Sequence, residues 1–226
     1  MRAFLIAITL AGCNGDNRST IDAAPIDAVP DAPPALNCST YCDEIQVNCI
    51  DANAQYADRA ACDAACKSFT VGTSTVTDMS GNTLGCRIYH GGPPSQTAPT
   101  THCANAGPGG DLISATPAFC SGGDICISFC ALEIAACGSL NAPLPGNPRD
   151  STNNPLFQYQ NMANCVEACS KFDKTHPYST TASGDSLACR LNEAVRASIS
   201  VMPDGAMHCS ATAANLKGAC AGTAMP

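Results

Sequence analysis

The spacing of the cysteines constrains the fold of this chain more than any other feature. Seventeen of its 226 residues are cysteine. From Cys38 to Cys120 they follow C-x3-C-x6-C-x12-C-x3-C-x19-C-x16-C-x16-C, and from Cys126 to Cys220 they follow C-x3-C-x6-C-x27-C-x3-C-x19-C-x19-C-x10-C. Each series has eight cysteines, and four of its seven spacings agree with the other series. This self-similarity predicts two copies of one unit.

Residues between the cysteines support the duplication. An aromatic residue stands six positions before the second C-x3-C of each copy, another stands three positions after it, and a His-Cys pair recurs later: these are Tyr56 and Tyr159, Phe69 and Phe172, and His102-Cys103 and His208-Cys209. We therefore predict one cysteine-rich unit over 38–120 and a second over 121–226.

The C-x3-C motifs predict helices, because two sulfurs four residues apart lie one helical turn apart on the same face. Two antiparallel helices that each carry C-x3-C can be stapled twice, which resembles the stapled helical hairpin of small plant defence peptides. We predict a mainly α fold of two tandem small disulfide-rich helical domains, each built on such a hairpin, with long loops. The predicted staples are Cys38–Cys66, Cys42–Cys62, Cys126–Cys169 and Cys130–Cys165.

The other cysteines of each copy are harder to assign, because sequence alone does not determine connectivity. The pairing that we expect for them is Cys49–Cys86, Cys103–Cys120, Cys137–Cys189 and Cys209–Cys220. Aromatic residues make up 5% of the chain, so each unit buries little apolar area. Disulfides contribute roughly 2–4 kcal/mol each and would decide the stability.

The N-terminus and the cysteine content both indicate an oxidising, extracytoplasmic compartment. MRAFLIAITLAGC contains Arg2, an apolar run and then Leu10-Ala11-Gly12-Cys13, which resembles the lipobox of bacterial lipoproteins. The resemblance implies that residues 1–12 are a signal peptide and that Cys13 is lipidated, which leaves sixteen cysteines to pair. Asn14 after Cys13 would direct such a lipoprotein to the outer membrane.

Residues 13–37 read as a disordered tether rather than as a binding site. Asn14 to Asn37 is rich in Asp, Ala and Pro and has almost nothing large to bury. At about 3 Å per residue, such a stretch spans up to about 70 Å.

Charge limits the partners of this chain. Its formal net charge is −8, with 11 Lys+Arg and no basic run, so we expect no nucleic-acid partner. No stretch after the signal approaches ~18 apolar residues, so the membrane would be reached through the lipid on Cys13 alone. We expect a further, unidentified protein or glycan partner.

The stretch SGDSLACR, 183–190, resembles the motif of the GDSL esterases and lipases, in which Ser186 would be the nucleophile. The first copy has SGNTLGCR at 80–87, where Asn82 and Thr83 replace Asp185 and Ser186. Both strings precede a segment with helical spacing, and Thr or Ser there is typical of a helix N-cap. The capping interpretation accounts for both copies.

A GDSL hydrolase also needs the base of a later Asp-x-x-His. The nearest candidate, Asp204 to His208, is one residue too long. We therefore expect no catalytic residue and no enzyme, with an esterase acting through Ser186 as a remote alternative.

Histidines suggest a second alternative, a redox protein or a metal or haem carrier. The chain has no C-x-x-C-H string for covalent haem, but His90, His102 and His208 are potential ligands. His102 and His208 stand at matching positions, whereas His90 has Glu193 opposite it. The simpler hypothesis is that each histidine hydrogen-bonds a neighbouring loop, and we expect no metal and no cofactor.

Two further features are candidates for recognition. Arg87 and Arg190 each follow a cysteine and would bind a carboxylate, either of a ligand or within the chain. The second copy also carries a polar insert, Gly138 to Gln160, that should form a surface loop.

The chain as a whole resembles cysteine-rich, tether-bearing bacterial lipoproteins with tandem helical disulfide units, a resemblance that implies no activity. We expect a non-enzymatic envelope or surface protein that acts as a binding or structural module.

Overall fold

The structure is a computed structural model that describes residues 35–72, 78–111, 120–139, 158–200, 204–214 and 218–222. Cys13, the signal peptide 1–12, most of the tether 13–37 and most of the insert lie outside the described residues. All the described residues belong to one compact unit, Pro33–Pro226. We call residues 35–120 the first half and residues 121–222 the second half.

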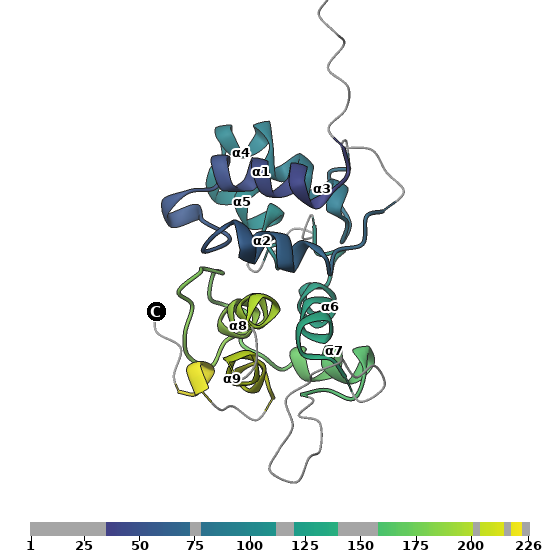
Figure 1. Cartoon of the computed structure of the whole chain (residues 1–226), viewed down its shortest axis with the longest axis vertical. Helices are drawn as coiled ribbons and strands as arrows, with labels where there is room; N and C mark the ends of the chain where they lie inside the picture. Colours follow the sequence, from purple (N-terminus) through teal and green to yellow (C-terminus); the bar gives the residue numbers. More distant parts are fainter. Residues whose placement is uncertain are drawn as a thin grey trace, which may run out of the picture. The chain divides into compact units, whose positions relative to one another are not determined.

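Helices make up the regular structure, as the sequence predicts (Figure 1). The first half contains α1 (Cys38–Asn48), η1 (Asp51–Asn53), α2 (Arg59–Cys66), α3 (Leu84–Gly91), α4 (Pro93–Thr97) and α5 (Pro99–Ala106). The second half contains α6 (Ile125–Cys137), α7 (Met162–Cys169), α8 (Leu187–Ile199), α9 (Asp204–Ala211) and η2 (Gly218–Cys220). None of the described helices is both long enough and apolar enough to span a membrane.

Six of the described helices begin where a short polar side chain accepts an otherwise unpaired backbone N–H. Such N-caps occur at matching places in the two halves: Asn37 and Asp124 for α1 and α6, Asp58 and Asn161 for α2 and α7, Thr83 and Ser186 for α3 and α8. Local sequence therefore determines where these helices start.

The four predicted C-x3-C staples are present. Cys38 is bonded to Cys66 and Cys42 to Cys62 in the first half. The corresponding pairs of the second half are Cys126–Cys169 and Cys130–Cys165. The predicted stapled hairpins are thus α1 with α2 and α6 with α7.

The expected pairing of the other eight cysteines is wrong. The structure has Cys49–Cys103 and Cys86–Cys120 instead of Cys49–Cys86 and Cys103–Cys120. It likewise has Cys137–Cys209 and Cys189–Cys220 instead of Cys137–Cys189 and Cys209–Cys220.

The reason for the different pairing is the path of the chain after α3. A short helix, α4, returns the chain so that α5 packs on α3 and also reaches α1. This places Cys103 beside Cys49 at the end of α1, with Cα atoms 5.5 Å apart. Among the cysteines outside the staples, those that follow one another in the sequence are therefore not the ones that form disulfides. The eight disulfides indicate an oxidising, extracytoplasmic environment.

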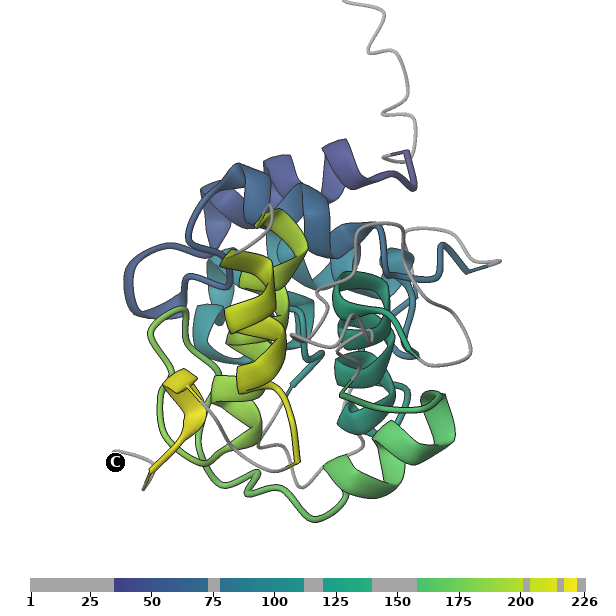
Figure 2. The ribbon, with the colours of Figure 1, turned by 60° about the horizontal axis from the view of Figure 1, so that its bottom comes forward.

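One hydrophobic core contains residues of both halves. The first half contributes side chains such as Tyr41 and Leu84, and the second contributes Phe129 and Leu191. Helix α2 packs against α8 (Figure 1), and α6 lies beside α8 (Figure 2). The junction between the halves is therefore a packed part of the protein.

Candidate functional site

Ser186 is a helix cap in this structure. Its Oγ accepts a hydrogen bond from the backbone N–H of Cys189 at 3.2 Å, and the side chain is 1% exposed. Thr83 does the same for Cys86 at 3.1 Å. The capping prediction is confirmed in both halves.

The histidines that could act as a base for Ser186 have other partners. His208, on α9, is hydrogen-bonded to Glu193. His176 lines a hollow that Ser186 also lines, but its Nε2 lies 3.2 Å from a carboxylate oxygen of Asp173. Among the described residues, no histidine is hydrogen-bonded to Ser186, so the base that a serine nucleophile requires is not in position.

His90 and His102 form a pair between α3 and α5. Their Nδ1 atoms are 2.7 Å apart, and His90 Nε2 lies 3.2 Å from the carbonyl oxygen of Met79. Because a carbonyl only accepts, His90 Nε2–H donates to it, and His102 Nδ1–H donates to His90 Nδ1. Burial lowers the pKa of His90; the hydrogen bond to Met79 partly opposes this shift, and His102 adds to it. The pair thus joins α3 to α5.

The second half has a comparable pair made from different residues. His208 Nδ1 donates to Glu193 Oε2 at 2.6 Å, which joins α9 to α8. His102 is hydrogen-bonded to His90, whereas His208 is hydrogen-bonded to Glu193, so His102 and His208 belong to separate pairs. The structure therefore does not bring His102 and His208 into one shared site.

The described residues contain one group with metal-ligand spacing, Cys86, His90 and Cys120, whose ligand atoms lie within 4.8 Å of one another. Cys86 and Cys120 are bonded to each other, however. A disulfide offers no thiolate, which is the form of cysteine that binds metal. With the disulfide intact, this group ties Cys120 to α3.

Arg87 and Arg190 are both buried and both bind within the chain. Each guanidinium lies over an aromatic ring, Phe69 at 4.0 Å and Phe172 at 3.9 Å. Arg190 has an ion pair with Asp185, with 2.8 Å between Nη2 and Oδ1. The intramolecular alternative for these arginines is therefore correct.

Arg87 differs because its partners among the described residues are uncharged. They are the carbonyl oxygens of Thr83, Gly107 and Pro108, the side-chain oxygen of Asn82 and the hydroxyl of Ser128. Burial lowers the pKa of Arg87, partly opposed by Tyr41 and Tyr56. Arg87 thus fixes the loop after α5 and contacts α6 of the second half.

A prediction follows from this difference between the halves. Asn82→Asp should raise the free energy of unfolding by about 1 kcal/mol, because a charge-assisted hydrogen bond to Arg87 replaces a neutral one. Asp185→Asn is the mirror variant and should lower it by a similar amount. Urea unfolding at pH 7 measures both, and a destabilised Asn82→Asp protein would contradict the prediction.

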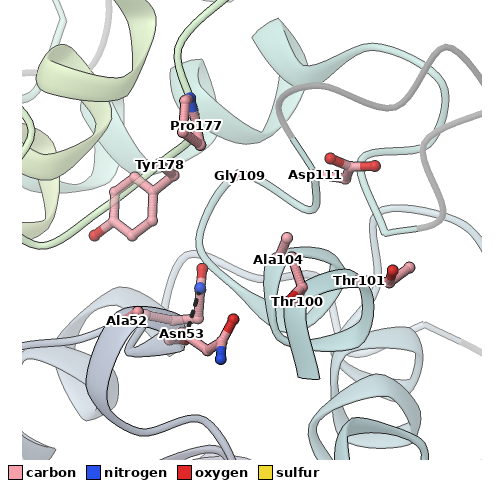
Figure 3. Close-up of a pocket in the computed structure, with 10 residues that line it drawn as sticks. Ala52, Asn53, Thr100, Thr101, Ala104, Gly109, Asp111, Pro177 and Tyr178 are labelled. Atoms are coloured by element: carbon pink, nitrogen blue, oxygen red, sulfur yellow. Dashed lines mark hydrogen bonds between the residues drawn. The ribbon is translucent and has the colours of Figure 1, made fainter. Parts of the chain in front are cut away.

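A cavity of about 400 Å³ lies at the junction of the two halves. The first half contributes residues from η1, α5 and the following loop, and the second contributes Pro177 and Tyr178 from the segment after α7. Figure 3 shows Pro177 and Tyr178 on one side of the cavity, across from Thr100 and Ala104. The lining residues are Ala52, Asn53, Gln55, Thr100, Thr101, Ala104, Gly109, Asp111, Pro177 and Tyr178.

The loop Gly107–Asp111 forms part of the cavity wall, and two of its glycines pack closely against neighbouring side chains. A Cβ atom on Gly107 would lie 2.0 Å from Gln55 Oε1, and one on Gly109 would lie 2.9 Å from Leu191 Cδ2. Asp111 has a positive φ of 90°, which is unusual for a residue with a side chain. Strained residues of this kind cluster at functional sites.

Sequence reasoning missed this cavity. Its residues belong to no motif, and the insert that was the first candidate for recognition lies mostly outside the described residues. The run Ala106-Gly107-Pro108-Gly109-Gly110 was the available signal, because adjacent glycines mark a close approach of backbone to its surroundings.

The first half of the chain is similar to a known protein family. Residues 35–128 match the model of the BfoA family C-terminal domain, a segment that covers the first half and the start of α6. No curated protein matches the chain. No solved structure matches it either.

Proposed function

We propose that this protein is a lipid-anchored, non-enzymatic binding module of the cell envelope, with residues 13–37 as its tether and two duplicated units as its folded part. The observation that carries the proposal is the pairing of cysteines. Sixteen of the seventeen form eight disulfides, which leaves Cys13 of the lipobox-like sequence.

The cavity at the junction supports a binding role. Its volume of about 400 Å³ falls in the range of small-molecule sites. It is built on a scaffold that disulfides and buried side chains hold in place, so a ligand would meet a preformed site at low entropic cost.

The anchor is tested by expressing the full-length chain in a bacterium that has an outer membrane and supplying a radiolabelled fatty acid. We expect label on the wild type and none on Cys13→Ala, which should leave the membrane fraction yet keep its eight disulfides. Asn14→Asp should remain labelled but stay in the inner membrane. Equal labelling of the wild type and Cys13→Ala would overturn the anchor.

A further inference from the structure

The junction cavity has a proline and an aromatic residue side by side in its lining. These are Pro177 and Tyr178, and they come from the second half (Figure 3). The Tyr178 hydroxyl is buried and has no hydrogen-bond partner among the described residues, so Tyr178 offers its ring rather than its hydroxyl. An aromatic ring beside a proline forms a flat surface on which an apolar ligand face packs.

Several of the other lining residues are polar and uncharged. Asn53, Thr100 and Thr101 line the cavity, and their side chains have no hydrogen-bond partner within the described parts of the chain. An amide both donates and accepts hydrogen bonds, and so does a hydroxyl. These three side chains therefore have free capacity for a ligand that carries several hydroxyl groups.

Charge narrows the ligand class further. No Lys, Arg or His is among the described lining residues, whereas Asp111 is one of them. Phosphate and carboxylate ligands are recognised by cations, and the described lining residues include none. The cavity thus suits an uncharged ligand.

We propose that the junction cavity binds a neutral sugar ring, with its C–H face on Tyr178 and Pro177 and its hydroxyl groups toward Asn53, Thr100 and Thr101. A pyranose is the ligand class that combines an apolar face with a rim of uncharged hydroxyls. The volume of about 400 Å³ is sufficient for one or two rings. This inference rests on the proposed function as a binding module and names its ligand class.

The test is calorimetric titration of the purified full-length protein with glucose, galactose and N-acetylglucosamine, with glucuronate as the charged counterpart. We expect at least one neutral sugar to bind with a Kd of about 1 mM or tighter, and glucuronate to bind more weakly. Tyr178→Ala should weaken binding about tenfold or more, because it removes the aromatic ring. Tyr178→Phe should bind like the wild type, because the buried hydroxyl has no hydrogen-bond partner among the described residues and faces no ligand.

Two further variants separate recognition from folding. Thr101→Val, at an exposed position, keeps the side-chain size and removes the hydroxyl, so it should weaken binding without changing the melting temperature. Tyr89→Ala removes a tyrosine of α3 that does not line the cavity, and it should leave the affinity unchanged.

The outcomes are distinct. Absence of binding by all three neutral sugars at 10-fold above the expected Kd, or equal binding by Tyr178→Ala, overturns the sugar site. A methyl glycoside that binds as well as the free sugar identifies the terminal sugar of a glycan as the ligand. A methyl glycoside that does not bind identifies the free monosaccharide as the ligand. Fatty-acid labelling of Cys13 is unaffected by these results, so failure of the sugar site and failure of the anchor are separable.

Discussion

The protein is expected to lose stability as the pH rises from 4.5 to about 8, because Glu133 binds a proton in the folded state that it releases on unfolding. Glu133 is 0% exposed on α6, where its Oε1 accepts a hydrogen bond from Thr212 Oγ1 at 2.8 Å and its Oε2 has no partner among the described residues. Burial raises its pKa to about 8, partly opposed by the Thr212 hydrogen bond.

The direction follows from proton linkage. Between the two pKa values the folded protein binds one proton more than the unfolded chain, so raising the pH favours unfolding by about 1.4 kcal/mol per unit. The stabilisation from Glu133 is therefore complete below pH 4.5 and is lost as the pH passes through about 8.

Glu133→Gln isolates this effect, because a neutral amide keeps the acceptor for Thr212 and does not titrate. We expect the free energy of unfolding of this variant, measured with urea from pH 4.5 to 8, to fall less steeply than that of the wild type by about 1.4 kcal/mol per unit. Glu167→Gln, at a side chain that is 72% exposed, is the control and should follow the wild type. Parallel curves for Glu133→Gln and the wild type would rule the assignment out.

Gly110→Ala is expected to lower the free energy of unfolding by about 3 kcal/mol or more, through overpacking as well as backbone strain. Gly110 has a φ of 68°, and a Cβ there would lie 2.4 Å from the carbonyl carbon and oxygen of Cys120. Those atoms are backbone, and the Cys86–Cys120 disulfide restricts their movement. The methyl group therefore has no room.

Gly123→Ala is the matched control for this prediction. Gly123 also has a positive φ, 89°, but a Cβ there meets nothing within 4 Å. The control should cost only the backbone strain of about 1–2 kcal/mol. Thermal unfolding compares the two variants, and equal losses would show that packing against Cys120 contributes nothing.

Features that depend on local spacing were predictable. The four C-x3-C staples follow from the helical period, because sulfurs four residues apart share a face whatever the rest of the chain does. The caps at Thr83 and Ser186 follow from side-chain chemistry at a helix start. For Ser186, this local chemistry explains the string that resembles an esterase motif.

The remaining disulfides were not predictable in the same way. The expected pairing joined Cys49 to Cys86, yet the return of the chain through α4 places Cys103 beside Cys49. The same holds for Cys137 and Cys209. Which cysteines meet depends on how α5 and α9 pack, and no local pattern encodes that packing.

The sequence by itself determined the helical hairpins, their staples and their caps, because each depends on residues within one or two turns of a helix or on a repeated C-x3-C spacing. Only the tertiary structure decided which of the remaining cysteines pair and where a ligand could sit. The junction cavity combines Asn53 and Thr100 of the first half with Tyr178 of the second. Residues so far apart in the chain come together only because the two halves share one hydrophobic core. That shared core depends on side-chain packing and not on the spacing of residues along the chain.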